Sequence, residues 1–154
     1  MLKYYNNITK TLTMPYKFND VLKDIPDDTE IIRFNEELNN YEYSKFNQEI
    51  KENVLPDSLH TLRLGYSFNQ EIKENVLPKS IKKISLYSHC NLINNLPLWI
   101  EEVLIKFNYD NDKDNKEITN LPITLERITI RDEKYLKYIT KIPFGCDIVI
   151  QKIE

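Results

Sequence analysis

Apolar residues recur at fixed distances from a set of prolines along this chain. In four units they lie three, six and eight positions after the proline, and the last two flank a single residue, as on a strand with one buried face. Proline suits the turn that enters such a strand, because no ladder N–H is needed there. The pattern therefore predicts one short strand per unit. The four apolar triplets are Leu59, Leu62 and Leu64; Ile81, Ile84 and Leu86; Ile100, Val103 and Ile105; and Leu125, Ile128 and Ile130.

A fainter unit precedes these four, and a degenerate unit follows them. The degenerate unit opens at Pro143, and its apolar residues Ile148 and Ile150 fall one place early. A terminal unit that departs from the pattern is expected of a cap in a repeat protein. The fainter unit consists of Pro26, Thr29, Ile32 and Phe34.

The repeat is also visible as an identical segment, FNQEIKENVLP, at residues 46–56 and 68–78. Successive prolines from the fainter unit onward are separated by 30, 22, 19, 25 and 21 residues. Units of this length with an L-x-x-L-x-L core are typical of leucine-rich-repeat solenoids, in which each unit adds one strand to a parallel sheet. We therefore predict a leucine-rich-repeat-like solenoid with one parallel β-sheet of about five or six short strands and a return side of loops and short helices.

The pattern also suggests how the chain is divided. We expect residues 1–24 to form an N-terminal cap segment and residues 25–154 to form the solenoid, with the degenerate C-terminal unit starting at about residue 142. Apolar residues at three-and-four spacing predict a short amphipathic helix over residues 18–25. Two long intervals contain insertions, residues 36–45 and 109–117, which we expect to be loops on the return side.

The FNQ element at the start of each identical segment has a structural interpretation. A side-chain amide at the same place in successive units can satisfy backbone groups of the turn and of the neighbouring unit. Asn91 occupies the same place as Asn69, thirteen residues after its proline. We therefore predict core and turn roles, and no ligand contacts, for Phe46, Asn47, Phe68 and Asn69.

Residues 46–86, from the first FNQ element to the second apolar triplet, resemble the FNIP repeats, which are 22-residue leucine-rich-repeat-like units of social amoebae and of giant viruses that infect amoebae. The resemblance implies an interaction scaffold. Some members carry an F-box ahead of the repeats and would be substrate receptors of a ubiquitin ligase. Residues 1–24 are shorter than an F-box. The alternative left open is a substrate-recognition subunit that lacks a recognisable F-box and has ubiquitin-ligase components as partners.

Composition and charge narrow the class of protein. The chain has no alanine and only two glycines among 154 residues, which argues against a helical bundle. Its net charge of −3 argues against a protein whose whole surface serves nucleic acid or a membrane. Two cysteines, with no secretion signal and no apolar stretch of membrane-spanning length, point to a reduced, cytoplasmic protein, in the host cytoplasm if it is viral.

Candidate chemistry is sparse. Asp110, Asp112 and Asp114 alternate as in a calcium loop, but Asn115 stands where the loop requires glycine, so we expect a solvated acidic loop. His89 lies next to Cys90, yet adjacent side chains point apart and no third group orients them. The sequence therefore predicts no enzyme, no catalytic or metal-binding residue and no cofactor.

One surface stands out. If the apolar triplets point inward, the fifth, seventh and ninth residues after each proline of the five units through Pro122 point out of the open face of the sheet. These fifteen positions include all four arginines of the protein. They carry six cations and Glu102, a formal +5, so the rest of the chain carries −8. The candidate partner-binding residues are Arg33, Arg63, Lys83, Tyr87, Lys106, Arg127 and Arg131.

Arginine offers planar, bidentate donors to carboxylate or phosphate, so the expected partner of this face is an acidic or phosphorylated protein segment. Two other interpretations stay open. The first is that the arginines have no binding role, because exposed strand positions tolerate any long side chain. The second is that the basic face binds a polyanion or RNA, although the net charge of the chain makes nucleic acid the less favoured partner.

Overall fold

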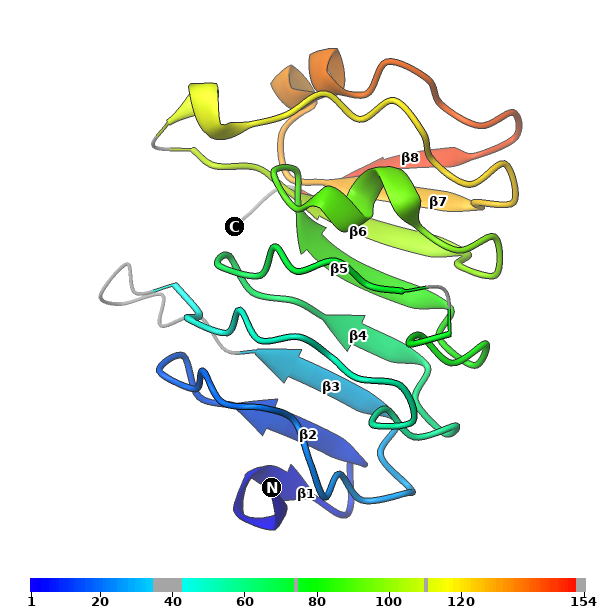
Figure 1. Cartoon of the computed structure of the whole chain (residues 1–154). Coiled ribbons are helices and arrows are strands. Elements are labelled where there is room, and N and C mark those ends of the chain that lie inside the picture. The colour runs from blue at the N-terminus through cyan, green and yellow to red at the C-terminus, as the bar shows by residue number, and fades with distance from the viewer. Residues whose placement is uncertain (35–42, 74, 110, 152–154) are drawn as a thin grey trace.

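The computed structural model describes residues 1–34, 43–73, 75–109 and 111–151. Within them, eight strands form one sheet in the order of the chain, β1 to β8 (Figure 1). Strands β2 to β8 pair in parallel, and β1 is antiparallel to β2. The strands are β1 Tyr5–Asn6, β2 Thr11–Met14, β3 Ile31–Phe34, β4 Thr61–Arg63, β5 Lys83–Tyr87, β6 Glu102–Lys106, β7 Arg127–Ile130 and β8 Asp147–Ile150.

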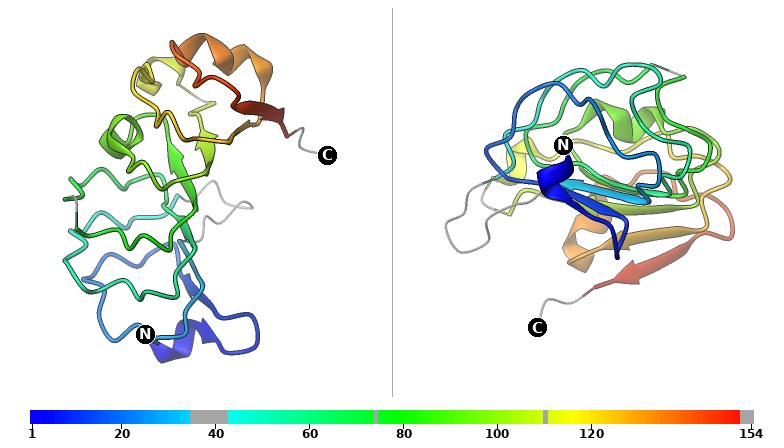
Figure 2. Two further views of the ribbon diagram at one scale, coloured as in Figure 1. Left: turned by 90° about the vertical axis from the view of Figure 1, so that its right-hand side faces the viewer. Right: turned by 90° about the horizontal axis from the view of Figure 1, so that it is seen from below.

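The predicted leucine-rich-repeat-like solenoid is confirmed, with two strands more than expected. The extra strands, β1 and β2, lie in residues that the sequence pattern assigned to a cap, and the sheet continues from β2 to β3 across that boundary. The division at residue 24 itself stays a prediction. The return segments between strands lie on one side of the sheet, so the other face is open (Figure 2).

The described residues also contain short 3-10 helices outside the strands. They are η1 Leu2–Tyr4, η2 Asn91–Asn95, η3 Asp112–Asp114 and η4 Glu133–Tyr138. In the part of the chain that the structure describes, no helix is long and apolar enough to cross a membrane. Of the two predicted insertions, residues 36–42 lie outside the described part. Residues 111–117 form η3 and an irregular segment after it, beyond the C-terminal ends of the strands (Figure 1).

The helix predicted over residues 18–25 is wrong, because this segment contains neither a helix nor a strand. Phe18 stacks on Phe46 with ring centroids 5.9 Å apart, and Leu22 is buried. These residues therefore pack as the return segment after β2, in the way that the FNQ segment packs after β3. Their three-and-four spacing arises from packing on the neighbouring unit, not from a helix.

The parallel register buries the apolar triplets as predicted. The middle members of the triplets lie opposite one another from strand to strand, so that Ile32, Leu62, Ile84, Val103 and Ile128 form one inward row. In the degenerate unit the strand starts one residue sooner after the turn. As a result Ile148 and Ile150, which fall one place early in the sequence, still pair with Ile128 and Ile130.

A recurring turn links each proline to its strand. The backbone N–H three residues after the proline donates to the proline carbonyl, at 3.0 to 3.2 Å in all six units. The turn uses only the carbonyl of proline, so its missing N–H costs nothing. The six donors are Thr29, Leu59, Ile81, Ile100, Leu125 and Cys146.

Asparagine side chains connect successive units. The N–H of Asn47 donates to Oδ1 of Asn19, that of Asn69 to Oδ1 of Asn47, and that of Asn91 to Oδ1 of Asn69, each at 2.9 Å. Phe46 lies in the core, where its ring stacks on that of the neighbouring Phe68. The core and turn roles predicted for the FNQ element are therefore what the structure shows.

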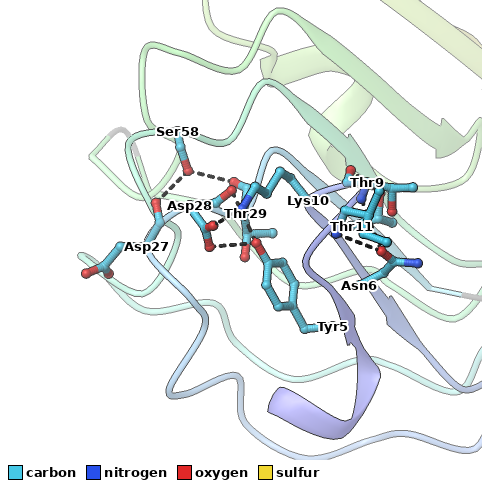
Figure 3. A network of polar contacts seen from close by, with 10 residues as sticks. Tyr5, Asn6, Thr9, Lys10, Thr11, Asp27, Asp28, Thr29 and Ser58 are labelled. Atoms are coloured by element: carbon cyan, nitrogen blue, oxygen red, sulfur yellow. Dashed lines mark hydrogen bonds and ion pairs between the residues drawn. The ribbon is translucent and has the colours of Figure 1, made fainter.

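Polar contacts fasten the N-terminal hairpin to the first repeat (Figure 3). The Tyr5 hydroxyl on β1 donates to the Asp28 carboxylate at 2.6 Å, and Lys10 forms an ion pair with the same carboxylate. Ser58 Oγ lies 2.7 Å from the carbonyls of both Asp27 and Thr29. The turn before β3 is thus held from both neighbouring units.

Candidate functional site

The open face of the sheet is built from three rows of side chains that the parallel register places side by side. In the middle row, Arg33 of β3 pairs with Arg63 of β4, and Arg63 pairs with Ser85 of β5. Arg127 starts β7, and Arg131 follows it at the other end of that strand. Arg33, Arg63 and Arg127 are exposed, and Arg131 is half-buried.

The face is cationic. It holds six lysines and arginines, and β8 adds Asp147 opposite Arg127 as a second carboxylate beside Glu102, which leaves a formal +4. Glu102 accepts from Lys83 at 3.1 Å and from Arg127 at 3.3 Å. These two cations are therefore partly neutralised within the protein.

The remaining candidate residues differ in how accessible their side chains are to a binding partner. Arg33 leans towards β2, where its Nε donates to Thr13 Oγ1 at 2.9 Å. Tyr87 is buried, with the Lys106 ammonium 5.2 Å from its ring centroid. Tyr87 thus supports the lysine rather than presenting its own hydroxyl to a partner. Arg63 and Arg131 form no ion pair with any other residue that the structure describes.

A hollow of about 490 Å³ lies on this face, at the centre of the sheet. Its volume is in the range of sites that bind small groups. Four cations line it, three from β4, β5 and β6 and one from the residue that follows β7: Arg63, Lys83, Lys106 and Arg131. The hollow therefore brings together four of the seven predicted partner-binding residues, and leaves Arg33, Tyr87 and Arg127 outside its lining.

Ser85 also lines this hollow and was missed as a functional candidate by the sequence. It is 5% exposed, and its Oγ has no hydrogen-bond partner among the described residues. An unsatisfied buried hydroxyl costs about 1–3 kcal/mol. One feature of the sequence could have indicated Ser85: it is a small polar residue between Arg63 and Leu104 in the outward row. The missing hydrogen-bond partner of its hydroxyl is visible only in the structure.

Comparison with known proteins gives the family of the central units. The family model described as "FNIP Repeat" matches residues 46–89. Residues 46–89 are therefore similar to FNIP repeats. No curated protein matches the chain. The solved structure of CroV588, described as a novel circular leucine-rich-repeat protein, is 27% identical to this chain, with a TM-score of 0.49. The alignment covers 73% of this chain and 19% of CroV588, so the chain spans about a fifth of that protein's length.

The units that match the FNIP repeat supply part of the hollow. Arg63, Lys83 and Ser85 lie within the matched residues, whereas Lys106 and Arg131 lie in the units that follow. The FNQ elements of the FNIP repeats lie on the return side, where they hold the units in register. Each matched unit therefore has two parts. Its FNQ element stabilises the return side, and its strand presents side chains on the open face.

His89 and Cys90 do not form a catalytic pair in this structure. His89 Nε2 lies 2.7 Å from the carbonyl of Tyr66, and its ring packs against the Tyr66 ring at 4.7 Å. Cys90 is buried, and burial raises the pKa of its thiol, which disfavours the reactive thiolate. Both residues serve packing after β5.

The acidic loop has internal partners as well. Asp112 accepts from Lys137 at 3.0 Å, and hydrogen bonds from Tyr138 and Lys137 lower the pKa of its carboxyl. Asp114 accepts from Asn108 at 3.0 Å, and Asp110 lies outside the described residues. The described residues contain no group of three or more side chains suited to hold a metal ion.

A second hollow of about 500 Å³ lies on the return side beside η2. Its walls are mostly apolar, and the indole N–H of Trp99 is buried there without a partner in the described part of the chain. Lys73 and Lys79 also line this hollow. With fewer cations, it is the weaker candidate for an anionic partner.

Proposed function

We propose that this protein is a non-enzymatic protein-interaction module that binds a partner on the open face of its sheet. FNIP repeats and a leucine-rich-repeat-like fold suggest an interaction module. The observation that supports this particular surface is that all four arginines of the chain, Arg33, Arg63, Arg127 and Arg131, lie on it, while most lysines lie elsewhere.

The partner in this proposal is an anionic protein segment. The face carries a formal +4 on a protein of net charge −3, so the remaining surface is acidic and repels the same partner. Arginine is the side chain best suited to recognise planar or tetrahedral anions through paired N–H donors. The proposal includes a cytoplasmic setting, which the unpaired thiols of Cys90 and Cys146 favour.

Charge reversal on the face tests the proposal. Arg63→Glu with Arg127→Glu removes two cations of the face, and both side chains are exposed, so we expect the fold to be retained, which circular dichroism checks. Lys51→Glu with Lys79→Glu is the matched control, with the same change in net charge at exposed positions outside the face. Quantitative mass spectrometry of proteins purified from host cells with each variant then compares the partners.

The expected result is that the arginine variant loses a partner that the wild type and the lysine variant both retain. Partners that survive the arginine exchange would contradict the proposal. Co-purification of a ubiquitin-ligase core would identify the alternative role of substrate-recognition subunit. Loss of all partners on ribonuclease treatment, with binding that falls steeply with salt, would instead identify RNA as the ligand of the basic face.

A further inference from the structure

We propose that the hollow around Ser85 is a binding pocket for the phosphate group of a phosphorylated protein side chain. This inference rests on the proposed function and makes it specific, because it selects phosphate over carboxylate and names one place on the open face. Two independent observations support it: the buried hydroxyl of Ser85 and the arrangement of cations around it.

The first observation is the hydroxyl. Ser85 lies in the middle of β5, 5% exposed, and its Oγ has no partner among the described residues although neighbouring side chains enclose it. The residue lines the hollow, so an acceptor placed in the hollow is within its reach. A hydroxyl donor at the bottom of a cationic pocket suits an anionic oxygen, which accepts a charge-assisted hydrogen bond.

The second observation is the source of the cations. Arg63 is the register partner of Ser85 on β4, Lys106 comes from β6, and Arg131 follows β7, so positive groups approach the hollow from both sides. Glu102, which also lines the hollow, is already engaged by Lys83 and Arg127. Arg63 and Arg131 have no such partner in the described part of the chain, and their charges are available to a ligand.

Phosphate fits this donor set better than carboxylate. A phosphorylated side chain carries a charge of about −1.5 to −2 and three acceptor oxygens. A carboxylate carries one charge, and a single arginine satisfies it with a bidentate pair. Two free guanidinium groups, an ammonium and a hydroxyl converging on one hollow exceed what one carboxylate can accept. A volume of about 490 Å³ also leaves room for the side chain that carries the phosphate.

The test uses degenerate peptide libraries with a fixed central residue. One set contains phosphoserine, phosphothreonine or phosphotyrosine, and the comparison sets contain serine, threonine, tyrosine or glutamate at the same place. The full-length wild-type chain should bind at least one phosphorylated library about tenfold more tightly than its unphosphorylated and glutamate counterparts. Equal binding of the glutamate library, or no binding of any phosphorylated library, would overturn the inference.

Variants then locate the site with the best peptide of the library. Ser85→Ala should weaken binding about tenfold, since it removes one charge-assisted hydrogen bond, and Arg63→Gln should weaken it at least as much. Lys51→Gln, an exposed lysine outside the face, should leave the affinity unchanged. Unchanged affinity of Ser85→Ala, in a variant that melts at or above the wild-type temperature, would overturn the assignment to this pocket.

A further arm separates this inference from the proposed function. The partner whose capture depends on Arg63 and Arg127 is treated with phosphatase before purification. If capture is lost, both proposals stand. If capture is kept, the open face still binds a protein but the phosphate inference is wrong. A single-stranded RNA that binds as tightly as the best phosphopeptide would also overturn it.

Discussion

Ser85 lies in the middle of β5 and Ser88 directly after its end, and both are buried, yet only one of them has a hydrogen-bond partner in the described protein. The Ser88 hydroxyl donates to Oδ1 of Asn115 at 3.0 Å. The Ser85 hydroxyl faces the open side of the sheet and has none. Two chemically identical side chains therefore make opposite contributions to the stability of the free protein.

This contrast gives the first prediction. Ser85→Ala should leave the free energy of unfolding within about 0.5 kcal/mol of the wild type, or raise it by up to about 1 kcal/mol, because a buried hydroxyl without a partner is removed. Ser88→Ala should lower it by about 0.5–1.5 kcal/mol, because Oδ1 of Asn115 loses one of its two donors and keeps the N–H of Asn108. Urea denaturation of both variants measures the difference. Equal destabilisation would mean that Ser85 has a partner in solution.

The asparagine ladder gives a second prediction. Oδ1 of Asn47 accepts from the backbone N–H of Asn69 at 2.9 Å and from Nε2 of Gln70 at 3.1 Å. Asn47→Ala removes both hydrogen bonds and should lower the free energy of unfolding by about 1 kcal/mol. Asn7→Ala, an exposed asparagine near the N-terminus, is the control and should change it by less than about 0.5 kcal/mol. An equal effect of the two changes would show that the ladder contributes nothing.

The aromatic stack on the return side gives a third prediction. The Phe46 ring is fully buried, with its centroid 4.1 Å from that of Phe34 and 5.7 Å from that of Phe68. Phe46→Ala should lower the free energy of unfolding by about 3–5 kcal/mol through lost burial and a cavity. Phe144→Ala, at a fully exposed phenylalanine, should change it by less than about 0.5 kcal/mol in the same denaturation experiment. A small effect at Phe46 would mean that the return side closes the cavity.

Much of the fold could be predicted because one signal recurs. The proline fixes the turn, and the residues three, six and eight places later are buried in every clear unit, so Leu59, Leu62 and Leu64 suffice to define the register. The first strand of the parallel part, β2, was not predicted, because no proline precedes Thr11 to mark its turn. The helix predicted over residues 18–25 fails for a related reason: spacing alone does not distinguish a helix from a return segment packed on Phe46.

The candidate site could be predicted only in part. Alternation along each strand places Arg63 and Arg131 on the open face, and this requires nothing beyond the register. Which side chains stay available depends on contacts across strands. Arg33 donates a hydrogen bond to Thr13 on β2, and the ring of Tyr87 packs against the ammonium of Lys106 on β6. Neither contact can be predicted from the sequence of one strand alone.

The ion pair that fastens the N-terminal hairpin gives the last prediction, for the effect of pH. Hydrogen bonds from Lys10 and then from Tyr5 lower the pKa of the Asp28 carboxyl below its usual 3.8. Because the folded pKa is the lower one, the carboxylate stabilises the fold fully above the usual pKa, and this contribution is lost as the pH falls through the folded pKa. Asp28→Asn should therefore lower the urea midpoint between about pH 6 and pH 8, and the difference from wild type should shrink below about pH 4. Asp57→Asn, at an exposed aspartate, is the control. A difference that persists unchanged at about pH 3 would show that the charge of Asp28 does not hold the hairpin.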